Sequence, residues 1–282
     1  MYYDLRQLLI SADKNKYAIP AFNFSDCWEL KAIVQAASEE NSPVIVASAV
    51  PIVEAFSLEE LASACDVTAR SAPIPVILHL DHSEDANLCI GAGERGYPSV
   101  MIDGSHLSLD ENIAATKKVV DKMRPLGVCV EAEIGRIRGR NDETSYDGGD
   151  YLGSVEDAVR LVRETGVDSL AVGLGNAHGF YQGKPEINFD RLREVNEAVS
   201  LPLVMHGGTG LSPQDIMTGI KNGINKVNVG TELHHVYLKA LAQKLDSKDI
   251  TPNIPLYMED AVNAVKQVVK RWIKICMSYG KA

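Results

Sequence analysis

Eight short apolar runs, separated by amphipathic stretches of helical period, constrain the fold of this chain more than any other feature. Runs of this length, rich in Val, Ile, Leu and Ala, indicate buried strands. Strands that alternate with helices pair in parallel, and eight such units in about 250 residues are typical of a TIM barrel. The predicted strands are residues 17–22, 43–48, 75–80, 99–103, 128–133, 169–172, 202–205 and 226–229.

Helical periodicity fills most of the intervals between these runs. The sequence predicts helices over residues 27–40, 58–71, 112–124, 155–165, 189–199 and 212–222, and a long extra helix over 256–279. No linker or low-complexity segment divides the chain. We therefore expect an α/β fold, a TIM (β/α)8 barrel with an extra C-terminal helix, as a single domain over residues 1–282.

Composition restricts the classes of function. The net charge of −10 argues against nucleic acid or an anionic membrane as a partner. Five cysteines without CxxC spacing indicate reduced thiols. Residues 1–6 lack an apolar signal core, and no apolar run reaches the roughly 20 residues that span a bilayer. We therefore expect a cytoplasmic protein.

Polar side chains lie at or after the end of every predicted strand, at the barrel edge where active sites of this fold lie. Three of them are histidines, and three imidazoles with one open position suit a catalytic zinc ion. The sequence thus predicts His82, His178 and His206 as ligands of one Zn2+. The polar residues at the eight strand ends are Asn23, Ser48, Asp81 with His82, Asp103, Glu133, His178, His206 and Asn228.

The other four histidines are weaker candidates. His79 lies within a predicted strand and is expected in the core, whereas His106 follows a strand end and could be a rim or capping residue. His234 and His235 lie on a helix after the last strand and are expected to be solvated.

Glycine-rich turns after the last two strands predict a phosphate site. Residues 207–210 read Gly-Gly-Thr-Gly and residues 228–231 read Asn-Val-Gly-Thr, and each turn opens a helix. Backbone amides at a helix N-terminus bind anions, and phosphate sites after the seventh and eighth strands are common in this fold. The expected substrate-binding residues are Asn23, Ser48, Gly207, Gly208, Thr209, Asn228, Gly230 and Thr231.

Taken in order, these motifs resemble the class II, zinc-dependent ketose-bisphosphate aldolases, the fructose- and tagatose-1,6-bisphosphate aldolase family. The resemblance runs nearly end to end. The matching stretches are Ala18-Ile-Pro-Ala-Phe-Asn23, Leu80-Asp-His82, Ser99-Val-Met-Ile-Asp-Gly-Ser105, Glu131-Ala-Glu-Ile-Gly135, Asp168-Ser-Leu-Ala-Val172, Ala177-His-Gly179, His206-Gly-Gly-Thr-Gly210 and Asn228-Val-Gly-Thr-Glu232.

The resemblance implies a role for each matching residue. It implies that Asp81 is the catalytic carboxylate, and that Asp103 and Glu133 can hold the metal in a second, more buried position. It adds Gly179 to the residues expected around the dihydroxyacetone phosphate moiety, and a monovalent cation, Na+ or K+, beside that phosphate. The resemblance also implies that this chain forms a homodimer or homotetramer. It further implies an accessory subunit, as in some tagatose-type members.

The sequence departs from the family in the long loop over residues 134–151, which is expected to act as a lid. Asn141 stands where the family places a proton-transferring glutamate, so Asp142 or Glu143 is expected to take that role. Ala49 stands where a hydroxyl residue is common. The Gly230-Thr-Glu-Leu233 stretch is closer to tagatose-type members.

The expected activity is reversible aldol cleavage of a ketose 1,6-bisphosphate, of tagatose or fructose type, to dihydroxyacetone phosphate and an aldehyde such as glyceraldehyde 3-phosphate. A metal-dependent sugar-phosphate isomerase or epimerase, or an aldolase for a related phosphorylated ketose, is the alternative. A Schiff-base aldolase is disfavoured because the sixth strand, residues 169–172, carries no lysine. A purely structural partner is disfavoured because it has no need of a costly polar cluster at the rim.

Overall fold

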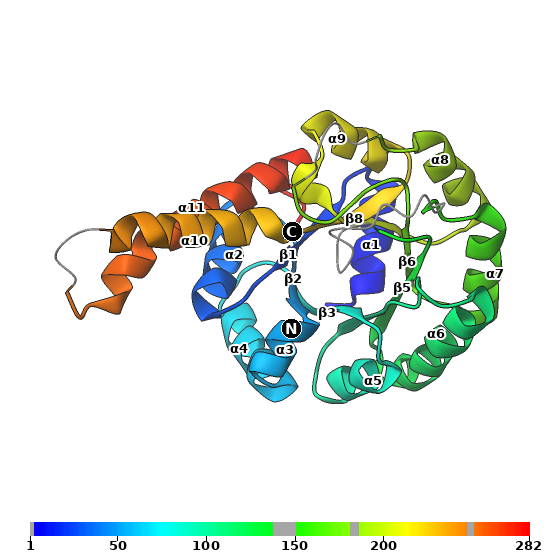
Figure 1. The fold of residues 1–282 in the computed structure, drawn as a ribbon, viewed down its shortest axis with the longest axis horizontal. Coiled ribbons are helices and arrows are strands. Elements are labelled where there is room, and N and C mark those ends of the chain that lie inside the picture. Colours follow the sequence, from blue (N-terminus) through cyan, green and yellow to red (C-terminus); the bar gives the residue numbers. More distant parts are fainter. Residues whose placement is uncertain (1–2, 138–150, 181–185, 247–250) are drawn as a thin grey trace.

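The structure, a computed structural model, describes residues 3–137, 151–180, 186–246 and 251–282. Eight parallel strands close into a barrel in sequence order, with β8 paired to β1, and helices surround it (Figure 1). The strands are β1 (Ile19–Asn23), β2 (Val44–Ala49), β3 (Val76–Ser83), β4 (Ser99–Ile102), β5 (Cys129–Ile134), β6 (Ser169–Val172), β7 (Leu203–Met205) and β8 (Ile224–Val229). The predicted TIM barrel is confirmed.

One helix precedes β1 and packs at the N-terminal end of the strands, and the other helices lie around the barrel (Figure 1). They are α1 (Leu5–Lys14), α2 (Cys27–Glu39), α3 (Val50–Ala55), α4 (Leu58–Arg70), α5 (Ala86–Glu94), α6 (Leu109–Met123), α7 (Val155–Thr165), α8 (Phe189–Ala198), α9 (Pro213–Lys221), α10 (Thr231–Leu245) and α11 (Ile254–Ile275), with short 3-10 turns η1 (Arg124–Leu126) and η2 (Gly208–Gly210). The extra C-terminal helix is present as α11, which packs against α10 and α2. In Figure 1, α10 and α11 extend to one side of the barrel.

Local sequence explains where several helices begin. Asp26, Ser57 and Ser154 precede α2, α4 and α7, and the side chain of each accepts a backbone N–H of the first turn. Before α6, Ser108 and Glu111 form a reciprocal capping box. Such caps satisfy N–H groups that have no partner inside the helix, so helix starts lie close to the predicted positions.

The barrel core has an apolar end and a polar end. At the N-terminal end of the strands, α1 packs Leu5 and Leu9 against Ile19, Ile45 and Ile77. Toward the other end, the interior contains a layer with His79, Glu131 and Lys226, all buried. Because α1 closes the N-terminal mouth, the polar residues of the interior can meet a ligand only from the C-terminal face.

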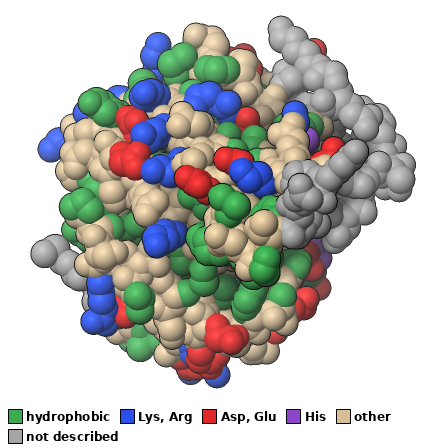
Figure 2. All heavy atoms as spheres, turned by 90° about the vertical axis from the view of Figure 1, so that its left-hand side faces the viewer, with side chains coloured by type: hydrophobic (Ala, Val, Ile, Leu, Met, Phe, Trp, Pro, Cys, Tyr) green, Lys and Arg blue, Asp and Glu red, His purple; other side chains and the backbone are tan. Residues whose placement is uncertain are grey.

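The described surface has no strong segregation of charge on the face drawn in Figure 2, where Lys and Arg side chains are interspersed with Asp and Glu side chains. Among the described residues, no helix combines the length and the apolar character that crossing a membrane requires.

Candidate active site

Two consecutive residues of β3, Asp81 and His82, both face the C-terminal mouth of the barrel. Strict alternation in a strand would point one of them outward. The register between β3 and β4 shifts between Leu80 and Ser83, and His82 has a left-handed backbone with φ of +49°. That conformation costs a non-glycine residue free energy, and its result is that both side chains enter one site. β3 therefore extends to Ser83, three residues beyond its predicted end at Leu80.

The three predicted metal ligands lie together. The ring centroids of His82 and His206 are 4.2 Å apart, those of His82 and His178 are 4.9 Å apart, and those of His178 and His206 are 6.1 Å apart. His206 is fully buried, and its Nδ1 has no hydrogen-bond partner among the described residues. Leaving a buried nitrogen unsatisfied is costly. Asp81, His82 and His206 have ligand atoms within 4.8 Å of one another and fit a divalent metal ion, whereas His178, among the described residues, joins no group this close.

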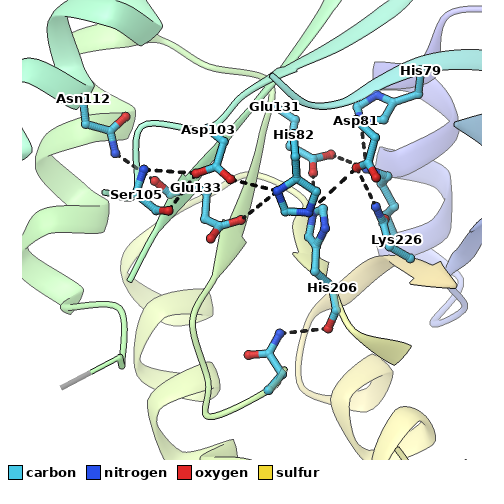
Figure 3. Close-up of polar contacts among 12 residues, drawn as sticks. His79, Asp81, His82, Asp103, Ser105, Asn112, Glu131, Glu133, His206 and Lys226 are labelled. Carbon is cyan, nitrogen blue, oxygen red and sulfur yellow. Dashed lines mark hydrogen bonds and ion pairs between the residues drawn. The ribbon is translucent and has the colours of Figure 1, made fainter. Parts of the chain in front are cut away.

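The other nitrogen of His206 is held from inside the barrel. Its Nε2 lies 2.9 Å from Oε1 of Glu131, and Oε2 of Glu131 lies 2.7 Å from Nζ of Lys226 (Figure 3). Burial lowers the pKa of His206 to about 4, with the nearby His82 acting in the same direction and the carboxylate of Glu131 opposing it. Burial by itself would raise the pKa of Glu131, but the charge of Lys226, the hydrogen bond with His206 and the nearby His79 together outweigh it and lower that pKa. The neutral imidazole is the form that coordinates a metal.

Asp103 and Glu133 lie on the side of the His82 ring that carries Nδ1. Nδ1 of His82 lies 2.8 Å from Oδ2 of Asp103 and 3.8 Å from Oε2 of Glu133 (Figure 3). Burial opposes ionisation of Asp103, yet its hydrogen bonds with His82 and Ser105 keep its pKa below the ordinary value. His82 thus belongs to two groups that could hold a metal ion, one with Asp81 and His206 and one with Asp103 and Glu133. The second contains the two acids for which the resemblance implies an alternative metal position.

Asp81 is fixed by two amide side chains. Asn23 Nδ2 donates to its Oδ2 at 2.8 Å, and Asn228 Nδ2 donates to its Oδ1 at 3.1 Å. Hydrogen bonds to a carboxylate favour its ionised form. Asn23 and Asn228, predicted as substrate contacts, therefore also position Asp81, and Oδ1 of Asn228 has no hydrogen-bond partner among the described residues.

A cavity of about 220 Å3 lies in front of these residues. The two glycine-rich turns form one wall, and a backbone N–H of Glu232 donates to Oγ1 of Thr209, which ties the turns together. Gly207 has φ of +70°, and a Cβ there would lie 2.0 Å from the carbonyl oxygen of Ala177, so only glycine fits. The lining residues are Asn23, Phe24, Ala49, Ile52, Asp81, His82, His178, Gly179, His206, Gly207, Thr209, Asn228, Gly230, Thr231 and His234.

Two expectations are wrong. Ser48 does not line the cavity: it is fully buried and its Oγ lies 3.1 Å from the hydroxyl of Tyr97. Strand alternation turns Ser48 away from the barrel interior and places the adjacent Ala49 at the cavity. His234 is not simply solvated, since it is half-buried and its Nδ1 lies 3.1 Å from Oε1 of Glu29.

Other expectations have different outcomes. Gly208 is buried behind the cavity wall and is not among its lining residues. His79 is a core residue as predicted, and burial lowers its pKa to about 3. Asn141, Asp142 and Glu143, the lid residues considered for proton transfer, lie outside the described residues.

Three functional neighbours were missed at the sequence level: Glu131, Lys226 and Asn176. Asn176 donates to the backbone oxygen of His206 at 2.8 Å and so positions the end of β7. A charged residue inside an apolar run was the available signal for Glu131 and Lys226. A buried charge requires a partner, although the pattern does not say which one.

Comparison with known proteins agrees with this geometry. The family model for class II fructose-bisphosphate aldolases matches residues 3–281. A 6-phospho-5-dehydro-2-deoxy-D-gluconate aldolase from Bacillus licheniformis is 36% identical over 284 aligned positions, which cover 100% of this chain and 97% of that protein. The crystal structure of the YdjI aldolase from Escherichia coli K12 is 34% identical, covers 100% of both chains and superposes with a TM-score of 0.88. A Coccidioides immitis protein of known structure is 29% identical, with 99% of this chain and 97% of that one covered and a TM-score of 0.90. The chain belongs to the class II fructose-bisphosphate aldolase family and is an aldolase.

Proposed function

We propose that this aldolase catalyses the reversible, zinc-dependent cleavage of a phosphorylated ketose, a ketose 1,6-bisphosphate of tagatose or fructose type, to dihydroxyacetone phosphate and an aldehyde. One observation carries the proposal. A single cavity is lined by Asp81, by the three histidines and by residues of both glycine-rich turns. Such a cavity can hold a phosphate at one end and place a ketone and its neighbouring hydroxyls at the other.

Zinc would be held by His82, His178 and His206, with Asp103 and Glu133 offering a second position beside His82. Nδ1 is the nitrogen that His206 can offer, because Glu131 occupies its Nε2. A bound zinc ion supplies a Lewis acid for the negative charge that develops on the ketone fragment during cleavage. The three imidazoles and the open cavity in front of them support this assignment.

Asp81 would act as the general base. When the C3–C4 bond of the ketose breaks, its electron pair stays with the ketone fragment, and C4 becomes the aldehyde carbon as its hydroxyl loses a proton. Asp81 lines the cavity and is held by Asn23 and Asn228, so its carboxylate can take that proton and return it in the reverse reaction. The ketone fragment then needs a proton at C3, a role we assign to Asp142 or Glu143.

The candidate substrates differ in the half that becomes the aldehyde product. The name of the Bacillus licheniformis relative specifies a ketone beside a phosphorylated carbon, and aldol cleavage of that compound also leaves a dihydroxyacetone phosphate fragment. Cleavage of either compound, the ketose 1,6-bisphosphate or the substrate named for that relative, thus uses the same phosphate-bearing ketone fragment. The two reactions differ in whether the aldehyde product carries a phosphate or a carboxylate. The Gly230-Thr-Glu-Leu233 stretch supports the tagatose-type bisphosphate.

The test is a product assay. The metal-free enzyme is supplied in turn with zinc and with no metal, and offered tagatose 1,6-bisphosphate, fructose 1,6-bisphosphate, a ketose 1-phosphate and 6-phospho-5-dehydro-2-deoxy-D-gluconate. We expect zinc-dependent release of dihydroxyacetone phosphate, fastest from a 1,6-bisphosphate. Conversion of a ketose phosphate into an isomer or epimer without that release would contradict the proposal and favour the isomerase alternative.

A further inference from the structure

A buried carboxylate behind the cavity, Glu29 of α2, holds a histidine that the proposed mechanism does not use. Glu29 is fully buried. Its Oε2 accepts the backbone N–H of Ser25 at 2.7 Å, and its Oε1 lies 3.1 Å from Nδ1 of His234. The hydroxyl of Ser25 lies 3.4 Å from the same nitrogen. These contacts fix the orientation of one imidazole ring and occupy its Nδ1.

His234 lies in the first turn of α10 and lines the cavity. It follows Thr231, another lining residue, by three positions, so both project from the same side of the helix. Since Nδ1 is engaged by Glu29, Nε2 is the nitrogen that remains for a ligand. Apart from the three proposed metal ligands, His234 is the only described lining residue that can carry a positive charge.

The backbone around His234 also suits an anion. α10 has 15 residues and begins directly after Gly230, a residue without a side chain to cap the helix. Of its first N–H groups, that of Glu232 donates to Oγ1 of Thr209. The first N–H groups of a helix and its dipole attract negative charge. The neighbouring turn brings Thr209 to the same wall through its contact with Glu232. An imidazole, two threonines and a helix N-terminus therefore converge on one end of the cavity.

We propose that His234, oriented by Glu29, binds the phosphate group of the substrate beside the N-terminus of α10 and is a determinant of specificity for phosphorylated ketoses. This inference rests on the proposed function, since it names a residue for the phosphate end of the same site. Glu29 acts as a positioning residue, because it is buried behind His234 and is not among the lining residues of the cavity.

A competing interpretation is that His234 serves only to neutralise the buried Glu29. The two interpretations differ in the effect of removing both groups. If His234 only neutralises Glu29, the double variant Glu29→Gln, His234→Ala binds ligand as the wild type does. If His234 binds phosphate, the double variant remains as weak as His234→Ala.

The experiment measures binding by calorimetry, with dihydroxyacetone phosphate, dihydroxyacetone and inorganic phosphate as separate probes of the zinc-loaded enzyme. We expect His234→Ala to bind dihydroxyacetone phosphate and inorganic phosphate about 10- to 100-fold more weakly, the range for losing a hydrogen bond to a charged group. Binding of dihydroxyacetone, which has no phosphate, should change less than about twofold. Glu29→Gln should weaken phosphate binding by a smaller factor, and His234→Gln, which keeps a donor, should recover part of the loss.

His235→Phe is the matched control. His235 is the next residue of α10 and is exposed, and its ring packs against Phe180 with centroids 5.3 Å apart. Phenylalanine keeps that contact while removing an imidazole, so binding should equal that of the wild type. Circular dichroism and the melting temperature of each variant establish that it is folded.

The outcomes separate this inference from the proposed function. Binding of both phosphate probes by His234→Ala within about twofold of the wild type would overturn the inference, as would restored binding in the double variant. A wild-type enzyme that binds neither dihydroxyacetone phosphate nor inorganic phosphate would also overturn the inference. A wild type that binds inorganic phosphate through His234 but cleaves no ketose would support the inference and contradict the proposed function.

Discussion

Lys226 and Glu131 form a buried charge pair that contacts neither the cavity nor the surface. Replacing Lys226 with methionine removes one charge of this pair and should therefore destabilise the barrel. Lys226 is fully buried, with its Nζ 2.7 Å from Glu131 and 3.2 Å from Nε2 of His79. At 2.7 Å the gross attraction between the two charges is about 6 kcal/mol for an effective dielectric constant near 20. Part of it offsets the cost of removing both charges from water, but methionine would leave the carboxylate of Glu131 buried without its cation.

The expected loss is about 3–5 kcal/mol of unfolding free energy, the usual cost of removing one partner of a buried pair. For a chain of 282 residues, each kcal/mol corresponds to about 2 °C, so the melting temperature should fall by about 6–10 °C. The assay is urea unfolding of wild type, Lys226→Met, Glu131→Gln and the double variant, analysed as a double-mutant cycle. The double variant should lose much less than the sum of the single variants, because it carries neither charge.

The pH dependence supplies a second check with a definite sign. The pKa of Glu131 is lower in the folded protein than in the unfolded chain, because Lys226, together with His206 and His79, outweighs the opposing effect of burial. Its contribution is therefore complete above the unfolded pKa, near 4.5, and falls as pH decreases below that value. Lys226→Met removes the largest of the contributions that lower this pKa, so the stability gap to the wild type should narrow between about pH 5 and pH 3. The reasoning is refuted if either single variant has a free energy of unfolding within about 1 kcal/mol of the wild type. It is also refuted if the effects in the cycle are strictly additive.

Further outcomes are expected at the site and in the core of the barrel. Removing metal with a chelator should abolish cleavage, and His178→Ala should lower the zinc content measured by metal analysis; a variant that retains full zinc would contradict the ligand assignment. Asp81→Asn should retain zinc yet lose about 10²- to 10⁴-fold in turnover, so near wild-type turnover would exclude its role as base. Gly207→Ala should destabilise the fold and disturb His206, because the new Cβ would meet the carbonyl oxygen of Ala177 at 2.0 Å; calorimetry that shows an unchanged melting temperature would contradict this. Burial holds the pKa of His79 at about 3, so the wild type should lose stability as pH falls below about 6.5, and His79→Gln should lose less over the same range in acid titrations of unfolding.

The sequence determined those features of the site that depend on residues close together in the chain. The tertiary structure determined those that depend on residues far apart in the chain. The sequence alone determined the barrel, because strand period, helix period and capping residues are local properties, and a barrel of parallel strands places every strand end on one face. It also determined that His82, His178 and His206 share that face, since each follows or ends a strand. The tertiary structure alone decided the orientations. Ala49 and not the predicted Ser48 lines the cavity because the pleat direction of β2 is set by its neighbours, and His82 faces the site only through its left-handed backbone.

The partners of the buried charges were also decided only by the tertiary structure. Glu131 and Lys226 are separated by 95 positions in sequence, and Glu29 and His234 by 205. Within one strand or helix, the sequence shows that such a residue is buried among apolar neighbours and therefore requires a partner. Which partner it finds depends on the closure of the barrel, which sets β8 against β1 and brings the first turn of α10 next to α2.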